Sequence, residues 1–177
     1  NVRASDVAGM IRKDTKAVIA LHASNVCGTI VPVEEIGRIC QERGVFFVVD
    51  TAQSAGTIPL HMEEACVDFL AFTGHKGLLG PQGVGGFLIS DRLDGQMEPL
   101  IAGGTGSSDS LDMPRTLPDK YESGTMNLPG IIGLHAALSY LERTGLETIR
   151  RRKLELTGYF LEEVKKLPSV RIAGRQG

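Results

Sequence analysis

A lysine and an aspartate each follow an apolar segment of this chain, where the segment turns polar. Lys76 lies in the turn Thr-Gly-His-Lys-Gly after the apolar run 69–72, and Asp50 comes directly after the apolar run 45–49. A lysine amine condenses with aldehydes, and a carboxylate keeps a pyridine nitrogen protonated so that the ring accepts electrons. Open α/β sheets bind ligands at the carboxyl ends of their strands. The pair therefore indicates a site for pyridoxal 5'-phosphate (PLP).

The elements that must position these two residues follow from the hydrophobic pattern. Alternating strands and helices predict an α/β sheet, and continuous apolar runs are typical of parallel strands covered on both faces. Past an aperiodic, glycine-rich stretch at 103–127, helical patterning resumes at 131 and again from 146 to 167. We expect strands at 16–22, 45–49, 67–72, 84–89 and 170–172, and a helix at 33–43 that ends at Gly44.

Composition excludes several classes of function. The 177 residues are 42% hydrophobic and 23% charged with a formal net charge of −2, which is ordinary for a soluble globular protein and predicts neither a nucleic-acid partner nor a membrane span. No leader is visible and the first residue is Asn1, so we expect a cytoplasmic protein and a chain that is a fragment of a longer one. Three widely spaced cysteines predict neither disulfides nor a metal site; Cys40 and Cys66 are expected to be small buried residues.

Ordered motifs along the chain resemble the class V aminotransferase family of fold-type I PLP proteins, and within it the cysteine desulfurase and selenocysteine lyase branch. The residues that carry the resemblance are His22–Thr29 (HASNVCGT), Asp50–Gln53 (DTAQ), Thr73–Lys76 (TGHK) with the turn Gly80–Gly85 (GPQGVG), and Glu122–Asn127 (ESGTMN). The segment 103–107 (GGTGS) further resembles a desulfurase-like subgroup.

The resemblance implies roles at the cofactor for seven residues. They are Lys76 as catalytic residue and Schiff-base partner, Asp50 at the pyridinium nitrogen, Gln53 at the phenolic oxygen, Thr73 and His75 at the phosphate, Asn25 beside the ring, and Thr105 at the phosphate of a neighbouring subunit. No metal is implied. Because the sulfur-accepting cysteine of the family lies on a C-terminal loop, we expect Cys27 to be a small apolar residue rather than a nucleophile.

The resemblance also implies which part of a larger fold this chain forms. We expect the central part of the fold-type I large domain, a mainly parallel sheet flanked by helices, at residues 1–144. Residues 145–177 would be a linking helix and the start of the small domain. An upstream phosphate loop and a ring-stacking histidine, and a downstream carboxylate-binding arginine and cysteine loop, would lie outside the chain. The fragment alone is therefore expected to bind PLP weakly and to be inactive.

The function implied is that of a PLP-dependent, cysteine desulfurase-like enzyme, a transferase or lyase that acts as a homodimer. Its substrate would be a small amino acid, cysteine first of all, and a protein would accept the sulfur. Three alternatives stay open: another class V activity (aminotransferase, lyase or hydrolase), a non-catalytic PLP-fold protein, and a nucleotide-binding α/β module. The last would need no lysine at a strand end.

Several of these residues also have a purely structural interpretation. Asp50 at a strand end could be the N-cap of a helix, and His75 could be an ordinary turn residue. His22 at another strand end is expected to be a hydrogen-bonded structural histidine. The basic run 150–153 is expected to be a solvated helix face. The turn at 80–85 is no dinucleotide fingerprint, because a strand rather than a helix follows it.

Overall fold

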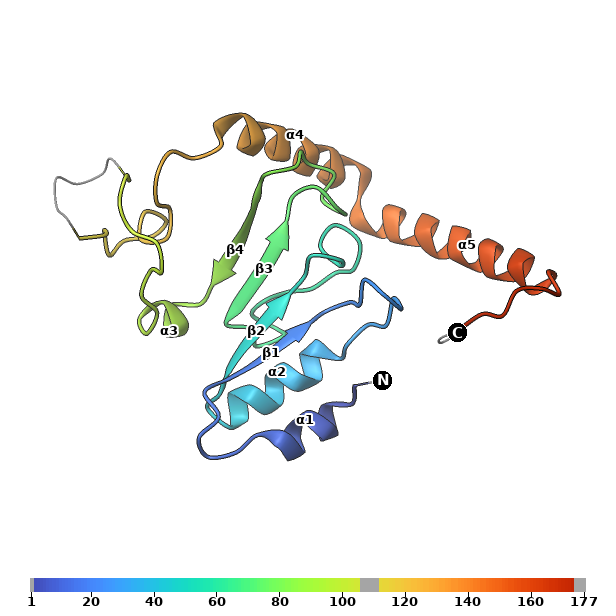
Figure 1. Ribbon diagram of the computed structural model, residues 1–177, viewed down its shortest axis with the longest axis horizontal. Coiled ribbons are helices and arrows are strands. Elements are labelled where there is room, and N and C mark those ends of the chain that lie inside the picture. The colour runs from blue at the N-terminus through green and yellow to red at the C-terminus, as the bar shows by residue number, and fades with distance from the viewer. Residues whose placement is uncertain (1, 106–111, 174–177) are drawn as a thin grey trace.

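A computed structural model describes residues 2–105 and 112–173 of the chain (Figure 1). Four strands form one sheet, and helices lie at both ends of the sequence. The strands are β1 (Ala17–Leu21), β2 (Phe46–Asp50), β3 (Phe69–Thr73) and β4 (Gly85–Ile89), and the helices are α1 (Ala4–Met10), α2 (Val33–Glu42), α3 (Asp91–Asp94), α4 (Leu128–Thr144) and α5 (Leu146–Lys165).

The sheet has the order β1-β2-β3-β4 and is mostly parallel, as the sequence predicts. β1 pairs with β2 and β2 with β3 in parallel, whereas β4 returns antiparallel to β3 through the turn 77–83. The parallel register places Leu21 beside Asp50 and Asp50 beside Ala71. The carboxyl ends of β1, β2 and β3 therefore lie together at one edge of the sheet (Figure 1).

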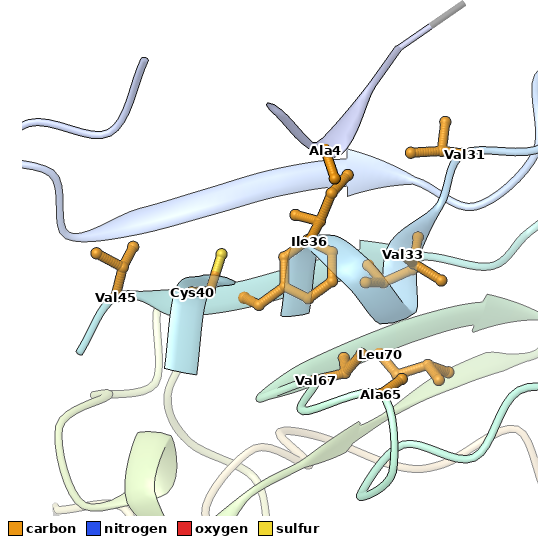
Figure 2. Packing of buried hydrophobic residues seen from close by; sticks show 11 residues of the cluster. Ala4, Val31, Val33, Ile36, Cys40, Val45, Ala65, Val67 and Leu70 are labelled. Atoms are coloured by element: carbon orange, nitrogen blue, oxygen red, sulfur yellow. The ribbon is translucent and has the colours of Figure 1, made fainter. Parts of the chain in front are cut away.

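The core lies between α2 and one face of the sheet. Ile36 and Cys40 of α2 are almost completely buried, and so are Phe47 and Val49 of β2. Figure 2 shows Val33, Ile36 and Cys40 of α2 among the core side chains, and α1 packs against α2 (Figure 1). A Cβ atom at Gly37 would overlap the backbone carbonyl of Ala65, so glycine permits the close approach of α2 to this loop.

The buried carboxylate of Asp68 stabilises the end of the sheet opposite to Asp50. Asp68 accepts hydrogen bonds from the Phe47 amide (2.9 Å), the Ser90 hydroxyl (3.0 Å) and Nε of Arg92 (2.9 Å). The guanidinium of Arg92 also stacks on the ring of Phe46, 4.6 Å from its centroid. This network joins the starts of β2 and β3 to the segment after β4. It also supplies the several partners that a buried charge requires.

The C-terminal helices lie at the edge of this body. Asn127 caps α4, because its Oδ1 accepts from the Gly130 amide (3.1 Å) while its Nδ2 donates to the Gly83 carbonyl (3.1 Å). α5 has no buried residue, and Figure 1 shows it projecting away from the sheet. The expected strand at 170–172 is wrong, since these residues form no strand and the described sheet ends at β1 and β4. Among the described residues, no helix is long and apolar enough to cross a membrane.

Candidate active site at the carboxyl ends of the parallel strands

The loops that leave β1, β2 and β3 are held to one another by backbone hydrogen bonds. The His22 amide donates to the Asp50 carbonyl (2.8 Å), and the Thr51 amide donates to the Ala71 carbonyl (2.9 Å). The Thr51 hydroxyl donates to the same Ala71 carbonyl (2.8 Å). Three of the sequence motifs, which end or begin at these strands, are thereby brought to one edge of the sheet.

Asp50 is the last residue of β2, and its side chain is exposed. Its Oδ1 accepts a hydrogen bond from the Ala52 amide (2.8 Å), which orients the carboxylate across the turn that follows the strand. The segment 51–58 forms turns rather than a helix, so the alternative that Asp50 is a helix N-cap is wrong. Oδ2 has no partner within the described part of the chain. Gln53 is exposed in the same loop.

Thr73, the last residue of β3, contacts the histidine two positions later. Thr73 Oγ1 and His75 Nδ1 lie 2.9 Å apart, so one hydroxyl and one imidazole face the solvent together. Lys76 is exposed in the same turn, and its carbonyl accepts from the Leu79 amide (3.0 Å). The ammonium group of Lys76 has no hydrogen-bond or ion-pair partner among the residues that the structure describes.

Two glycines lock the loop after β2 against the loop after β3. Gly56 has φ +78°, and a Cβ atom there would overlap the Gly77 carbonyl and lie 2.9 Å from the Leu78 amide nitrogen. A Cβ atom at Gly77 would overlap the Ala55 carbonyl in return and lie 3.0 Å from the Thr57 hydroxyl. This interlock fixes the backbone next to Lys76 relative to the loop of Asp50. No signal in the sequence pointed to this contact between the Gly56 and Gly77 segments.

Asn25 lies in a turn after β1 that spans Ser24 to Thr29. The Ser24 amide donates to the Thr29 carbonyl (2.9 Å), and the Asn25 side chain is exposed. Cys27 in this turn is exposed rather than a buried filler, which corrects the expectation from the sequence. Hydrogen bonds from Ser24 and Thr29 lower the pKa of the Cys27 thiol to about 7, and Thr29 Oγ1 lies 3.3 Å from its sulfur.

Two further sequence expectations need correction. His22 is buried, but its Nδ1 has no hydrogen-bond partner in the described part of the chain, so it is not the hydrogen-bonded residue we expected. Burial lowers the pKa of His22, which favours the neutral imidazole, although Glu34 opposes the shift. His22 follows Ala20 on the α2 side of the sheet, opposite to Asp50. Cys66 is only half-buried, and it occupies a turn with φ +51°.

Thr105 is not brought to the other site residues of the same chain. In Figure 1 the segment around 98–105 lies beyond β4, on the side away from β1. The Gly124 amide donates to the Gly103 carbonyl (2.9 Å), which joins this segment to the Glu122–Asn127 motif. Gly106 and Ser107, which completed the motif, lie outside the described residues.

A buried ion pair near this segment was not foreseen from the sequence. Lys120 is 8% exposed, and its Nζ donates to Oδ1 of Asp94 in α3 (2.9 Å) and to the Asp94 carbonyl (2.7 Å). The Tyr121 hydroxyl donates to the same Oδ1 (2.8 Å), and its ring packs edge-on against Phe87. The cluster anchors the segment before Glu122 to the sheet.

The basic run on α5 is exposed, apart from half-buried Arg150, with one contact to the site loops. Lys153 Nζ donates to the Thr57 hydroxyl (2.6 Å), next to the Gly56–Gly77 interlock. The site thus receives support from α5 as well as from the sheet. Among the described residues, no cluster of three or more histidine, cysteine or acidic side chains is arranged to hold a metal ion.

Comparisons with known proteins find relatives of this chain. The "Probable cysteine desulfurase" of Methanothermobacter thermautotrophicus is 36% identical over 93% of this chain and 42% of its own length, and that of Halalkalibacterium halodurans is 38% identical over 99% and 44%. The apo cysteine desulfurase from Thermococcus onnurineus NA1 superimposes with a TM-score of 0.85 at 38% identity, over 99% of this chain and 44% of that one.

A second kind of enzyme matches equally well in structure. The cystine C–S lyase C-DES, solved with its reaction product cysteine persulfide, has a TM-score of 0.84 at 29% identity, over 98% of this chain and 48% of its own. The chain spans less than half the length of each of these relatives. The family model for "Aminotransferase class-V" matches residues 1–177. This chain therefore belongs to the class V aminotransferase family, and its fold is that of the fold-type I PLP-dependent enzymes.

Proposed function

We propose that this chain is the central part of a PLP-dependent enzyme that removes sulfur from cysteine. The observation that carries the proposal is the arrangement of Asp50, the last residue of β2, and Lys76, in the loop after the adjacent parallel strand β3. The loops after these two strands are interlocked at Gly56 and Gly77. The relatives named as cysteine desulfurases support the substrate. Because the chain spans less than half of their length, the activity is that of the whole protein.

The residues at the strand ends fit the cofactor. Asp50 presents a free carboxylate oxygen for a pyridinium N–H, and Gln53 in the same loop would bind the phenolic oxygen. Thr73 and His75 hydrogen-bond each other next to Lys76, and the remaining donor of this pair would bind a phosphate oxygen. PLP, once bound, supplies an aldehyde for amines and a ring that accepts an electron pair from the substrate's α-carbon.

The chain's own residues would then move and hold protons. Lys76 would hold the cofactor through its amine, and its Nζ, when free, would accept the proton from the α-carbon of a bound substrate. The negative charge of Asp50 would keep the proton on the pyridine nitrogen. Asn25, from the turn after β1, would lie beside the ring. The nucleophile that takes the sulfur would come from a cysteine loop outside this chain.

The assembly around the site is also part of the proposal. We place Thr105 at the phosphate of a neighbouring subunit in a homodimer, which fits its distance from the other site residues of its own chain. Residues 1–144 would belong to the large domain and 145–177 to the linking helix and small domain, with the break at Gly145 (φ +81°) between α4 and α5. We further propose a cytoplasmic protein and a sulfur-accepting protein partner.

A C–S lyase acting on cystine is the second candidate, because C-DES superimposes as closely as the cysteine desulfurase does. The two reactions leave different carbon products. A desulfurase yields alanine from cysteine, whereas a C–S lyase eliminates across the Cα–Cβ bond and yields pyruvate and ammonia. Incubating the full-length protein with each substrate and measuring alanine and pyruvate separates the two. Pyruvate from cystine, with no alanine from cysteine, would favour the lyase.

The cofactor site is tested first by chemical labelling of the full-length protein. Borohydride reduction and peptide mapping should place the pyridoxyl group on Lys76. Lys153, another surface lysine near the same loops, is the matched control and should stay unmodified. A label on Lys153 or Lys120 would contradict the assignment.

The role of Asp50 is tested by Asp50→Asn in the full-length protein. A neutral amide no longer holds the ring nitrogen protonated, so we expect the variant to keep its cofactor while kcat falls by about 100-fold or more, which corresponds to roughly 3 kcal/mol. Cofactor content is read from absorbance and turnover from product release. Wild-type turnover in the variant would remove Asp50 from the mechanism.

A further inference from the structure

A basic cavity lies at the end of the sheet opposite to the candidate active site. Its volume is about 610 Å³, and the five cations that line it are Arg12, Lys13, Lys16, Arg43 and Arg92. Among the described residues, no aspartate or glutamate lines it. The whole chain carries 19 lysines and arginines against 21 acidic residues, so this concentration of positive charge is local and does not follow from composition.

Three separate segments bring these cations together. The turn after α1 is closed by the Thr15 amide, which donates to the Arg12 carbonyl (3.1 Å), and by the Arg12 amide, which donates to the Thr15 hydroxyl (2.9 Å). The Phe46 amide donates to the Lys16 carbonyl (3.0 Å), which joins the start of β1 to the start of β2. Arg43 at the end of α2 and Arg92 in α3 are the other two cations that line the cavity.

Most of this charge is not neutralised within the described part of the protein. Arg92 is committed to Asp68, and Arg43 donates only one bond, to the Ala8 carbonyl (2.6 Å). Arg12 forms an ion pair with the exposed Asp14 through Nε (3.1 Å), and its terminal nitrogens have no partner among the described residues. Lys13 and Lys16 have no hydrogen-bond or ion-pair partner among the described residues. Four cations therefore keep N–H donors available around one cavity.

We propose that this basic cavity binds a small-molecule polyanion with two or more linked phosphate groups. Its volume lies within the range of small-molecule sites, roughly 300–1,000 Å³, and its concave shape suits a compact ligand better than a flat protein surface. Guanidinium groups bind phosphate through paired N–H donors, while lysine ammonium groups act as point charges. Linked phosphates match several cations at once, whereas a single phosphate engages only some of them.

The basic cavity is distinct from the place proposed for PLP. It lies at the amino-terminal ends of β1 and β2, whereas Asp50 lies at the carboxyl end of β2. A strand of five residues at about 3.3 Å each separates the two by roughly 15 Å. The inference therefore goes beyond the proposed function and does not depend on it.

The test is isothermal titration of the full-length, PLP-loaded protein with sodium tripolyphosphate at low salt. We expect one ion per chain, with no change in cofactor absorbance. The double variant Lys13→Gln with Lys16→Gln should weaken binding by at least about tenfold, since charge-assisted hydrogen bonds are lost at exposed positions that do not hold the fold together. The matched control is Arg151→Gln with Arg152→Gln, which removes the same charge from α5 and should change the affinity by less than about twofold.

Four results would overturn the proposal. One is the absence of tripolyphosphate binding at low salt. Another is an equal loss of affinity in the α5 control, which would mean that the ion responds to net charge alone. The third is release of the cofactor by the ion, which would place binding at the other end of the sheet. Orthophosphate should bind at least about tenfold more weakly than tripolyphosphate, and equal affinity would refute recognition of linked phosphates.

Discussion

Replacement of Gly56 by alanine tests whether the interlock of the two site loops is as tight as the structure indicates. Gly56 has φ +78°, which is unfavourable for alanine by about 1–2 kcal/mol. The added Cβ would also overlap the Gly77 carbonyl and lie 2.9 Å from the Leu78 nitrogen. Backbone atoms yield less readily than side chains, so this overlap adds about 1–3 kcal/mol. We therefore expect the free energy of unfolding to fall by about 3 kcal/mol.

Gly28→Ala is the matched control, because Gly28 has φ +67° but nothing within 4 Å of the new Cβ. The control carries the same left-handed strain and the same change in the unfolded chain, and so isolates the overlap. Urea denaturation of the full-length protein should show Gly56→Ala to be less stable than Gly28→Ala by about 2 kcal/mol. PLP titration should show at least a tenfold loss of affinity only for Gly56→Ala. Equal destabilisation of the two variants would refute the interlock.

Three further predictions concern other parts of the molecule. Although burial opposes the shift, hydrogen bonds from Arg92 and its neighbours lower the pKa of Asp68 below its ordinary value of 3.8. The carboxylate therefore stabilises the fold above about pH 4, and this stabilisation is lost on acidification. The free energy of unfolding of Asp68→Asn should be about 3 kcal/mol lower at pH 7, and it should fall less than that of the wild type in acid denaturation. Iodoacetamide should alkylate Cys27, which is exposed and has a pKa of about 7, long before Cys40, because burial raises the pKa of Cys40 to about 11. Mass spectrometry across pH 6–9 checks the order, and preferential labelling of Cys40 would contradict it. Lys120→Met should destabilise the protein by about 2 kcal/mol in thermal denaturation, because a carboxylate of α3 loses its buried ammonium partner, whereas the same change at an exposed lysine should have almost no effect.

Most of the fold could be predicted from the sequence, because buried parallel strands produce continuous apolar runs. The strands around Val49 and Leu70 and the helix that carries Ile36 were confirmed within two residues of their observed bounds. The strand at 170–172 failed for a physical reason. Three apolar residues satisfy the local pattern of a strand, but a strand needs a partner, and pairing is decided by tertiary structure. The short helices α1 and α3 left too weak a pattern to be predicted.

The candidate site was predicted in its chemistry rather than in its architecture. Asp50 and Lys76 were predicted from the combination of an acid and an amine at the ends of two apolar runs, since either residue alone would be weak evidence. Gly56 was missed because its importance lies in a contact with Gly77, and a contact between distant residues leaves no trace in a single sequence. The exposure of Cys27 was also missed. Cysteine is usually a buried residue, but the turn around Cys27 faces the solvent.

The order of the strands in the sheet also determines how this region can fold during synthesis. β1, β2, β3 and β4 stand in the sheet in the order in which the ribosome produces them. Each new strand can therefore add to an edge that already exists, without waiting for a distant part of the chain. The unit of β1, α2 and β2 already encloses Ile36 and Phe47, so we expect it to be the nucleus onto which β3 and the loop of Lys76 assemble. The loop of Asp50 would thus be in place before β3 and the loop of Lys76 join the sheet.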